Sequence, residues 1–303
     1  MASDPVYDCY DLFAGSGGMS LGLLEAGWRP LGVEWISVFA ATHRKQVGPC
    51  LNIDVADFHP DYPVALVAGG SPCKSFSVAG NRRALDDERG KLIFQFIRVA
   101  GESAERAILF ENVLGILSAI AYQGRDDLVL DILLTELKKV GFGHIEYRQL
   151  DSHDYGTPQL RRRVFFVGFR DIKDAERFTW PAPSHGPGTG RPYVTARDAA
   201  KIPFDEPAPS ISAYEHKAGT HSALVIPYRN LQHSYERMVS LTGHVFPKPT
   251  IEQYAALMGY PKGFKFEGTK PQQFEQMGNS VAPPVARALG LSIRRALQLP
   301  VPR

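Results

Sequence analysis

The sequence predicts an α/β protein in which helices cover both faces of a doubly wound, mostly parallel sheet. Two observations predict this class. Short apolar runs alternate with segments of helical periodicity through the first half of the chain, which implies βαβ units. A glycine-rich turn also joins the first apolar run to the first helical pattern. The chain has 303 residues, enough for about two domains.

The strands are predicted from short apolar runs that turn residues or polar segments interrupt. Glycines 69 and 70, for example, end the run that begins at Val64. The predicted strands cover residues 7–13, 31–33, 64–68, 107–110, 145–150 and 164–169.

The helices are predicted from apolar residues at helical spacing. The third of them is the best defined, because Asp126 and Asp127 stand at its beginning, two lysines stand at its end, and Gly141 occupies the C-cap position. The first predicted helix passes through Leu21, Leu24 and Glu25 and is ended by Gly27, and the other three cover residues 91–100, 126–140 and 281–297.

The character of the sequence changes near Thr179, where clusters of proline and glycine begin. Residues from about 177 to 271 are therefore expected to form a second, smaller and less regular domain. Helical periodicity returns at Val281.

Composition excludes several classes of protein. A hydrophobic content of 44% with 22% charged residues is typical of a globular chain, not of a disordered, collagen-like or coiled-coil chain. No apolar stretch is long enough to span a membrane, and the first residues lack the pattern of a signal peptide. Three cysteines are too few for a disulfide framework, so we expect a reducing, cytoplasmic location. The net charge of +2 requires that any nucleic-acid site be a local basic cluster.

The turn after the first strand has the features of a nucleoside-binding loop. It contains Phe13, Gly15 and Gly17, and glycines let a ligand approach the main chain. Glu34 lies roughly 20 positions after Phe13, where a carboxylate binds ribose in doubly wound folds, and Trp35 could stack on a base. A tight structural turn is the alternative. The strict G-x-G-x-x-G spacing is absent, which disfavours a dinucleotide relative to S-adenosylmethionine.

Cys73 follows the strand at residues 64–68 and so emerges at the same sheet edge. Nearby cations favour a reactive thiolate, and Lys74, Arg82 and Arg83 are close in sequence. Alternatively, Cys73 is a buried side chain that only packs in the apolar core, which is our interpretation of the other two cysteines.

Glu111 follows the strand at residues 107–110 and reaches this edge as well. Burial there would raise its pKa and make it a candidate proton donor. Arg161 and Arg163 alternate along an extended segment, so both guanidinium groups lie on one face and suit a phosphate or the Glu111 carboxylate. Alternatively, Glu111 is a solvated acid, and Arg161 and Arg163 belong to the solvated beginning of a strand.

Five ordered blocks, together with Gly259-Tyr260-Pro261, resemble the C5-cytosine DNA methyltransferases. The blocks are Phe13-Ala14-Gly15-Ser16-Gly17-Gly18, Pro72-Cys73, Glu111-Asn112-Val113, Gln159-x-Arg161-x-Arg163 and Gly278-Asn279-Ser280-Val281. The resemblance covers the chain except for about residues 172–246, the region that varies with the DNA target in this family. One departure is Lys74, where the family usually has glutamine; it adds a positive charge near the DNA that the resemblance implies.

The resemblance implies a Rossmann-like methyltransferase sheet and transfer of a methyl group from S-adenosyl-L-methionine to C5 of a cytosine flipped out of double-stranded DNA. Cys73 would attack C6, Glu111 would stabilise the charge that develops, and Arg163 with Arg161 would orient Glu111 and hold the target. Lys74, Ser75, Arg82 and Arg83 would belong to a DNA-contacting loop. The residues implied to contact the cofactor are Phe13, Gly15, Gly17, Glu34, Trp35, Asp54, Pro72, Leu92, Asn279 and Ser280.

Because Asn279 and Ser280 lie near the end of the chain, the resemblance implies a discontinuous large domain. We expect a catalytic and cofactor-binding domain over residues 1–176 plus 272–303, and a target-recognition domain over 177–271. The expected partners are double-stranded DNA and, as a candidate, a cognate restriction endonuclease, with the enzyme itself a monomer. No metal is expected. Two alternatives remain: a tRNA cytosine-C5 methyltransferase, although the Cys-Phe-Thr tripeptide of that branch is absent, and a catalytically silent DNA-binding regulator.

Overall fold

The computed structural model describes residues 7–72, 85, 90–124, 126–210, 228–243, 245 and 247–302, with the backbone alone for 228–234. Within these ranges one seven-stranded sheet has the order β3-β2-β1-β4-β5-β7-β6. The strands are β1 (Cys9–Leu12), β2 (Pro30–Val33), β3 (Cys50–Leu51), β4 (Val64–Gly69), β5 (Ala104–Asn112), β6 (His144–Asp151) and β7 (Arg162–Phe169).

The sheet is mostly parallel, as predicted. β1 pairs in parallel with β2 and β4, β2 with β3, and β4 with β5. Only β7 runs the other way, because it is antiparallel to both β5 and β6. The carboxyl ends of β1, β2, β4 and β5 therefore meet at one edge of the sheet, the edge at which ligands bind in doubly wound folds.

Two apolar cores cover the two faces of the sheet, so the fold has three layers. Side chains alternate along each strand, and Tyr10 and Leu12 of β1 join one core while Cys9 joins the other. The first core packs against α3 (Leu92–Ser103) and α4 (Val129–Lys139). The second packs against α1 (Gly18–Glu25) and α10 (Pro283–Ala296).

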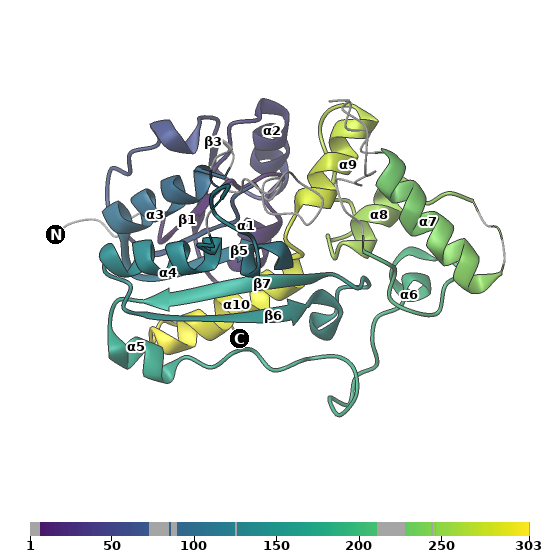
Figure 1. The fold of residues 1–303 in the computed structure, drawn as a ribbon. Helices are drawn as coiled ribbons and strands as arrows, with labels where there is room; N and C mark the ends of the chain where they lie inside the picture. Colours follow the sequence, from purple (N-terminus) through teal and green to yellow (C-terminus); the bar gives the residue numbers. More distant parts are fainter. Residues whose placement is uncertain are drawn as a thin grey trace.

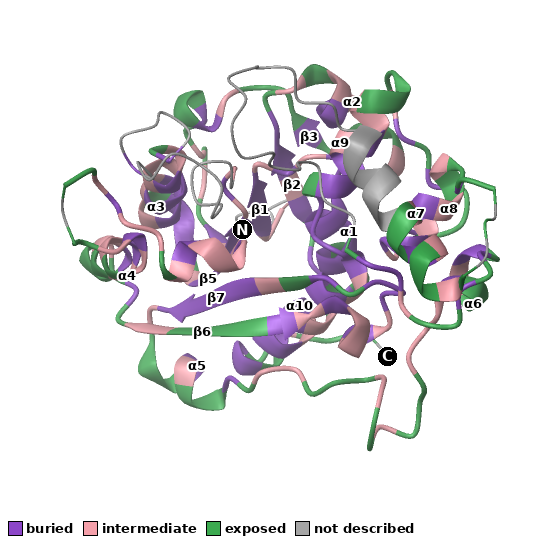
Figure 2. Ribbon diagram, turned by 45° about the vertical axis from the view of Figure 1, so that its right-hand side comes forward, coloured by how far each residue is buried: buried purple, intermediate pink, exposed green. Residues whose placement is uncertain are grey.

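The sheet is buried unevenly along its antiparallel end. β7 is buried over six consecutive residues, whereas the edge strand β6 is exposed over four. Figure 2 shows the same contrast between the two strands. Parallel strands covered on both faces read as continuous apolar runs, which explains why 64–68 and 107–110 were predictable as buried strands.

A third core lies beside the sheet and is built mainly from the less regular region. It contains Phe204, Tyr254, Phe264 and Phe266, and also Leu21 of α1. The helices here are α6 (Ala196–Ala200), α7 (Tyr228–Thr242), α8 (Ile251–Leu257) and α9 (Lys270–Asn279). Figure 1 shows these four helices grouped to one side of the sheet.

Several predicted boundaries were wrong. The helix predicted from residue 126 begins at Val129, because residues 120 and 128 form a β-bridge and the Ala121 amide donates to the Asp127 carbonyl. The strand predicted over 107–110 extends from Ala104 to Asn112, so Glu111 lies within it. Helices α2 (Ser37–Gln46), α5 (Ile172–Arg177) and α6 to α9, and the short strand β3, were not predicted from the sequence.

Candidate active site

The glycine-rich turn between β1 and α1 has a backbone that few residues adopt. Phe13, Gly15 and Gly17 all have positive φ, at 57°, 56° and 89°. This region is accessible to glycine but strained for phenylalanine. A Cβ on Gly15 would meet no atom within 4 Å, so the main chain is open on that side. The turn therefore presents bare backbone at the carboxyl edge of the sheet.

Glu34 follows β2 and lies against this turn. Its Oε2 accepts a hydrogen bond from the Gly15 amide at 2.9 Å, and its Oε1 accepts one from the Ile36 amide at 2.7 Å. Burial raises the pKa of this carboxyl group, and the two amide donors oppose that shift. Each carboxylate oxygen can accept a further hydrogen bond.

Two more predicted cofactor residues stand next to Glu34. Trp35 is 66% exposed, an unusual state for an indole ring, and Asn52 Nδ2 donates to the carbonyl oxygens of both Glu34 and Trp35. Asp54 begins a short 3₁₀ turn, where its Oδ1 accepts from the Ala56 amide at 2.9 Å. Only one of the Asp54 oxygens is used by this cap.

The end of β5 carries the predicted catalytic acid. Glu111 Oε1 lies 3.4 Å from Arg163 Nε of β7, and the two side chains are only 12% and 16% exposed. Burial raises the pKa of Glu111, while Arg163 first and then Arg161 act in the opposite direction. A Cβ on Gly70 would lie 2.8 Å from Glu111 Oε2, so the carboxylate sits directly beside the segment that leads to Cys73.

Asn112, the neighbour of Glu111, holds that segment in place. Its Nδ2 donates to the Ser71 carbonyl at 3.2 Å, and its Oδ1 accepts from the Val113 amide at 2.9 Å. Pro72 follows Ser71 and is partly buried. The predicted residues Cys73, Lys74, Ser75, Arg82 and Arg83 lie outside the described residues.

Arg161 reaches a different part of the site from Arg163. It is buried, and its Nη2 donates to the carbonyl oxygens of Gly278 and Ser280 at 2.9 and 2.8 Å. Its charge still acts on Glu111. Arg161 therefore acts on Glu111 through its charge and also holds the backbone on both sides of Asn279.

The remaining predicted cofactor residues come from distant parts of the chain. Leu92 is the first residue of α3 and is partly buried. Asn279 is exposed at the end of α9, and Ser280 next to it is buried. The Ser280 hydroxyl lies 2.6 Å from the Tyr260 phenol oxygen, which in turn lies 3.0 Å from the Ser16 hydroxyl of the glycine-rich turn.

A buried chain of polar side chains, which was not predicted from the sequence, lies behind the same turn. Asp11 Oδ2 lies 2.6 Å from Ser20 Oγ, Ser20 Oγ lies 2.9 Å from His43 Nε2, and His43 Nδ1 lies 3.1 Å from the Gly48 carbonyl. A Cβ on Gly17 would touch the His43 ring at 2.8 Å. Asp11, an acidic residue within an otherwise apolar strand, was the sequence signal that could have indicated these buried hydrogen bonds.

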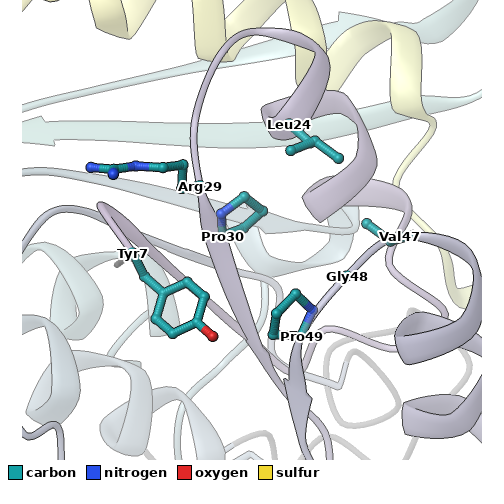
Figure 3. Close-up of a pocket in the computed structure, with 7 residues that line it drawn as sticks. All are labelled: Tyr7, Leu24, Arg29, Pro30, Val47, Gly48 and Pro49. Atoms are coloured by element: carbon teal, nitrogen blue, oxygen red, sulfur yellow. The ribbon is translucent and has the colours of Figure 1, made fainter. Parts of the chain in front are cut away.

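A cavity of about 230 Å³ lies elsewhere, and Figure 3 shows the residues around it. Tyr7, Pro30 and Pro49 line it, just before or at the starts of β1, β2 and β3. It is therefore at the amino ends of these strands, opposite the edge that holds Gly15, Glu34 and Glu111.

Two features are absent from the described part of the chain. No three side chains of histidine, cysteine, aspartate or glutamate are grouped as metal ligands there. No helix in those ranges has both the length and the apolar character that a membrane span requires.

Comparison with known proteins establishes the family. The chain matches the model for the C-5 cytosine-specific DNA methylase over residues 7–187 and 208–295. It is 34% identical to the type II methyltransferase M.NaeI of Lentzea aerocolonigenes, over 95% of this chain and 75% of that one. It is 28% identical to M.Eco47II of Escherichia coli, over 96% and 79% of the two chains.

Solved structures show the same fold. The S. pombe Dnmt2 methyltransferase matches with a TM-score of 0.65 and 17% identity, over 97% of this chain and 100% of that one. At this sequence identity, the structural similarity is evidence for the fold alone. On the family model and the relatives, the chain belongs to the C-5 cytosine-specific DNA methylase family and is a DNA (cytosine-5-)-methyltransferase.

Proposed function

We propose that this enzyme transfers a methyl group from S-adenosyl-L-methionine to C5 of a cytosine flipped out of a specific double-stranded DNA sequence, through a covalent bond between Cys73 and C6. The observation that carries the proposal is the buried Glu111–Arg163 pair beside Gly70. The proposal is supported by a carboxyl group of raised pKa next to Gly70, which stands three residues before Cys73 in the sequence.

The residues of the glycine-rich turn fit the cofactor. Gly15 leaves open space where a side chain would stand, and Glu34 keeps acceptor capacity for ribose hydroxyls after its two amide bonds. The exposed Trp35 ring suits an adenine face, and the free Asp54 oxygen suits the adenine amine. Asn279 and Ser280 would contact the cofactor from the other side. When bound, S-adenosyl-L-methionine supplies the methyl group.

Cys73 and Glu111 would then activate cytosine together, since C5 is a poor nucleophile in an aromatic ring. The Cys73 thiolate forms an Sγ–C6 bond while Glu111 donates its proton to N3, which leaves C5 enamine-like. After C5 has taken the methyl group, it loses its proton to a base, the Sγ–C6 bond breaks, and N3 returns its proton to Glu111. Arg163 keeps Glu111 in place, since its Nε lies 3.4 Å from Glu111 Oε1, and its charge stabilises the carboxylate that remains after the proton has moved to N3.

The proposal assigns different functions to two parts of the chain. Residues 1–176 and 272–303 would form the catalytic domain, and residues 177–271 the target-recognition domain. Base flipping costs a few kcal/mol, which contacts from Lys74, Ser75, Arg82 and Arg83 would offset. We place the enzyme in the cytoplasm as a monomer, with a cognate restriction endonuclease as a candidate partner.

Bisulfite sequencing of plasmid DNA from cells that express the chain tests this function. We expect 5-methylcytosine at one short sequence in cells with the wild type. Cys73→Ala should abolish it, and Glu111→Gln should reduce the rate at least a hundredfold, the usual scale of general acid catalysis. Cys9→Ala is the matched control, because Cys9 is buried at the amino end of β1, and this variant should remain active.

Each alternative has its own outcome in that experiment. Full methylation by Cys73→Ala would reject the covalent mechanism. Methylated RNA with unmodified DNA would favour the tRNA enzyme. DNA binding by the purified wild type without any methyl transfer would favour the silent regulator.

A further inference from the structure

Three segments that are far apart in sequence meet at one buried polar junction beside the glycine-rich turn. Ser16 belongs to that turn, Tyr260 follows α8, and Ser280 follows α9. Their side-chain oxygens form a chain, with 3.0 Å from Ser16 to Tyr260 and 2.6 Å from Tyr260 to Ser280. All three residues are buried, at 2%, 4% and 8% exposure, so water does not replace these bonds.

The direction of donation along this chain follows from its last member. The Ser280 hydroxyl donates to the Val281 carbonyl at 3.0 Å, and a carbonyl can only accept. The Tyr260 phenol must therefore donate to Ser280, and Ser16 must donate to Tyr260. Burial raises the pKa of the phenol, which keeps it protonated and able to donate. Within this chain, Tyr260 both accepts a hydrogen bond from the glycine-rich turn and donates one to the C-terminal segment.

The packing at the junction shows that the contact is close. A Cβ on Gly18 would collide with the Ser280 hydroxyl and the Val281 carbonyl, and would lie 2.9 Å from the phenol oxygen. The Tyr260 ring is held by two phenylalanines, with ring centroids 4.3 Å from Phe264 and 5.1 Å from Phe266. The phenol direction is thus set before any ligand arrives.

Arg161 holds the C-terminal side of the junction independently. Its two bonds to the Gly278 and Ser280 carbonyls flank Asn279, whose side chain is left exposed. The backbone around Asn279 is therefore fixed by Arg161, and its distance from the glycine-rich turn is fixed by Tyr260.

We propose that Tyr260 is a positioning residue for the cofactor site, whose hydroxyl sets the glycine-rich turn against Asn279 and Ser280. This inference rests on the proposed function, because it takes both segments as parts of one S-adenosyl-L-methionine site. Tyr260 itself lies in the segment proposed to recognise DNA, so the recognition segment supplies a bond that shapes the cofactor site.

The test is binding of S-adenosyl-L-homocysteine, measured by calorimetry on the full chain. Tyr260→Phe keeps the ring and removes the hydroxyl, which leaves a buried donor and a buried acceptor unpaired. We expect the Kd to rise about tenfold, the effect of one buried hydrogen bond. In turnover, the KM for S-adenosyl-L-methionine should rise by a similar factor with less than a threefold change in kcat. Tyr155→Phe is the matched control, since that buried phenol donates to the Pro181 carbonyl, and its Kd should stay within twofold of the wild type.

A double-mutant cycle separates positioning from general loosening of the fold. If the hydroxyls act as one chain, Ser16→Ala with Tyr260→Phe should bind no more weakly than Tyr260→Phe alone. A Tyr260→Phe Kd within twofold of the wild type, or additive effects of the two changes, would overturn the proposal. If Tyr260→Phe does not fold, Ser16→Ala alone must weaken binding several-fold. Wild-type protein that fails to bind S-adenosyl-L-homocysteine would reject the proposed cofactor and this inference together, whereas normal wild-type binding with an unaffected Tyr260→Phe rejects the inference alone.

Discussion

At the scale of the residue, the buried hydrogen-bonded chain Asp11–Ser20–His43 contains two titratable side chains, Asp11 and His43. Because the Gly48 carbonyl can only accept, His43 Nδ1 carries a proton. The Ser20 hydroxyl lies between the two titratable groups: it donates to Asp11 Oδ2 and lies 2.9 Å from His43 Nε2. Burial disfavours charge on both groups, since it raises the pKa of Asp11 to about 6 and lowers that of His43 to about 4.

His43→Gln should therefore change how stability depends on pH. A histidine whose pKa is lower in the folded state binds more protons when unfolded, so the wild type loses stability as pH falls from 6.5 toward 4. The raised pKa of Asp11 makes its contribution to the free energy of unfolding change with pH in the opposite direction. Asp11 is present in both proteins, so the comparison isolates His43. Between pH 7 and 5 we expect the wild-type free energy of unfolding to fall by about 2 kcal/mol relative to His43→Gln.

Urea unfolding at the two pH values measures this difference. The exposed His59 provides a control, and His59→Gln should track the wild type at both pH values. A wild-type to His43→Gln difference that is the same at pH 5 and pH 7 would show that His43 is not held neutral by burial.

At the scale of the element, the close approach of α1 and α10 joins the two ends of the chain. The indole of Trp28 donates to the Gly290 carbonyl at 3.1 Å. Glycines permit this spacing, since a Cβ on Gly22 would strike the Pro283 carbonyl, and would lie 2.7 Å from the Arg287 amide nitrogen. These obstacles are backbone atoms, which cannot move aside as a flexible side chain can.

Gly22→Ala should consequently destabilise the protein although alanine is the better helix former. Overpacking costs about 1–3 kcal/mol or more, which exceeds the gain of about 1 kcal/mol in helix propensity. We expect a net loss of about 2 kcal/mol in urea unfolding. Gly143→Ala is the control, because a Cβ there meets nothing within 4 Å. Equal stability of the two variants would contradict the close packing of α1 on α10.

Predictability differed between elements for physical reasons. Strands β4 and β5 are covered on both faces, so their sequences are continuous apolar runs and they were recognised. Helix α2 has a weaker apolar pattern, since only Phe39, Ala40, Thr42 and His43 are buried, and it was missed. Helix α4 starts later than predicted because Asp126 and Asp127 precede a β-bridge residue rather than cap the helix.

At the scale of the whole molecule, a net charge of +2 requires DNA binding to depend on where the basic residues lie. Arg82 and Arg83 follow β4 in sequence, and the carboxyl end of β4 is at the edge that carries Glu111. Lys138 and Lys139 end α4, which connects the parallel strands β5 and β6 and so runs back toward the opposite edge. The two pairs carry equal charge, and Lys138 and Lys139 end a helix that runs away from the edge that carries Glu111.

Removing the first pair should weaken the salt dependence of DNA binding. Each phosphate contact contributes about 0.9 to the slope of log K against log salt. Arg82→Ala with Arg83→Ala should therefore reduce the magnitude of that slope by about 2, as measured by fluorescence anisotropy on duplex DNA. Lys138→Ala with Lys139→Ala should leave it unchanged. Equal slopes for the two double variants would show that Arg82 and Arg83 are solvated surface charges that do not contact phosphate.

The sequence alone was sufficient for the α/β class, the parallel strands, and the placing of Glu34 and Glu111 at strand ends, because periodicity and turn residues are local properties. The family followed from motifs that comparison then confirmed. Only the tertiary structure joined Ser16 to Tyr260 and Ser280, gave Arg161 backbone partners on both sides of Asn279, and packed His43 beneath Gly17. Such contacts depend on how distant segments pack, and a hydroxyl or a guanidinium group in a sequence does not reveal which partner burial will give it.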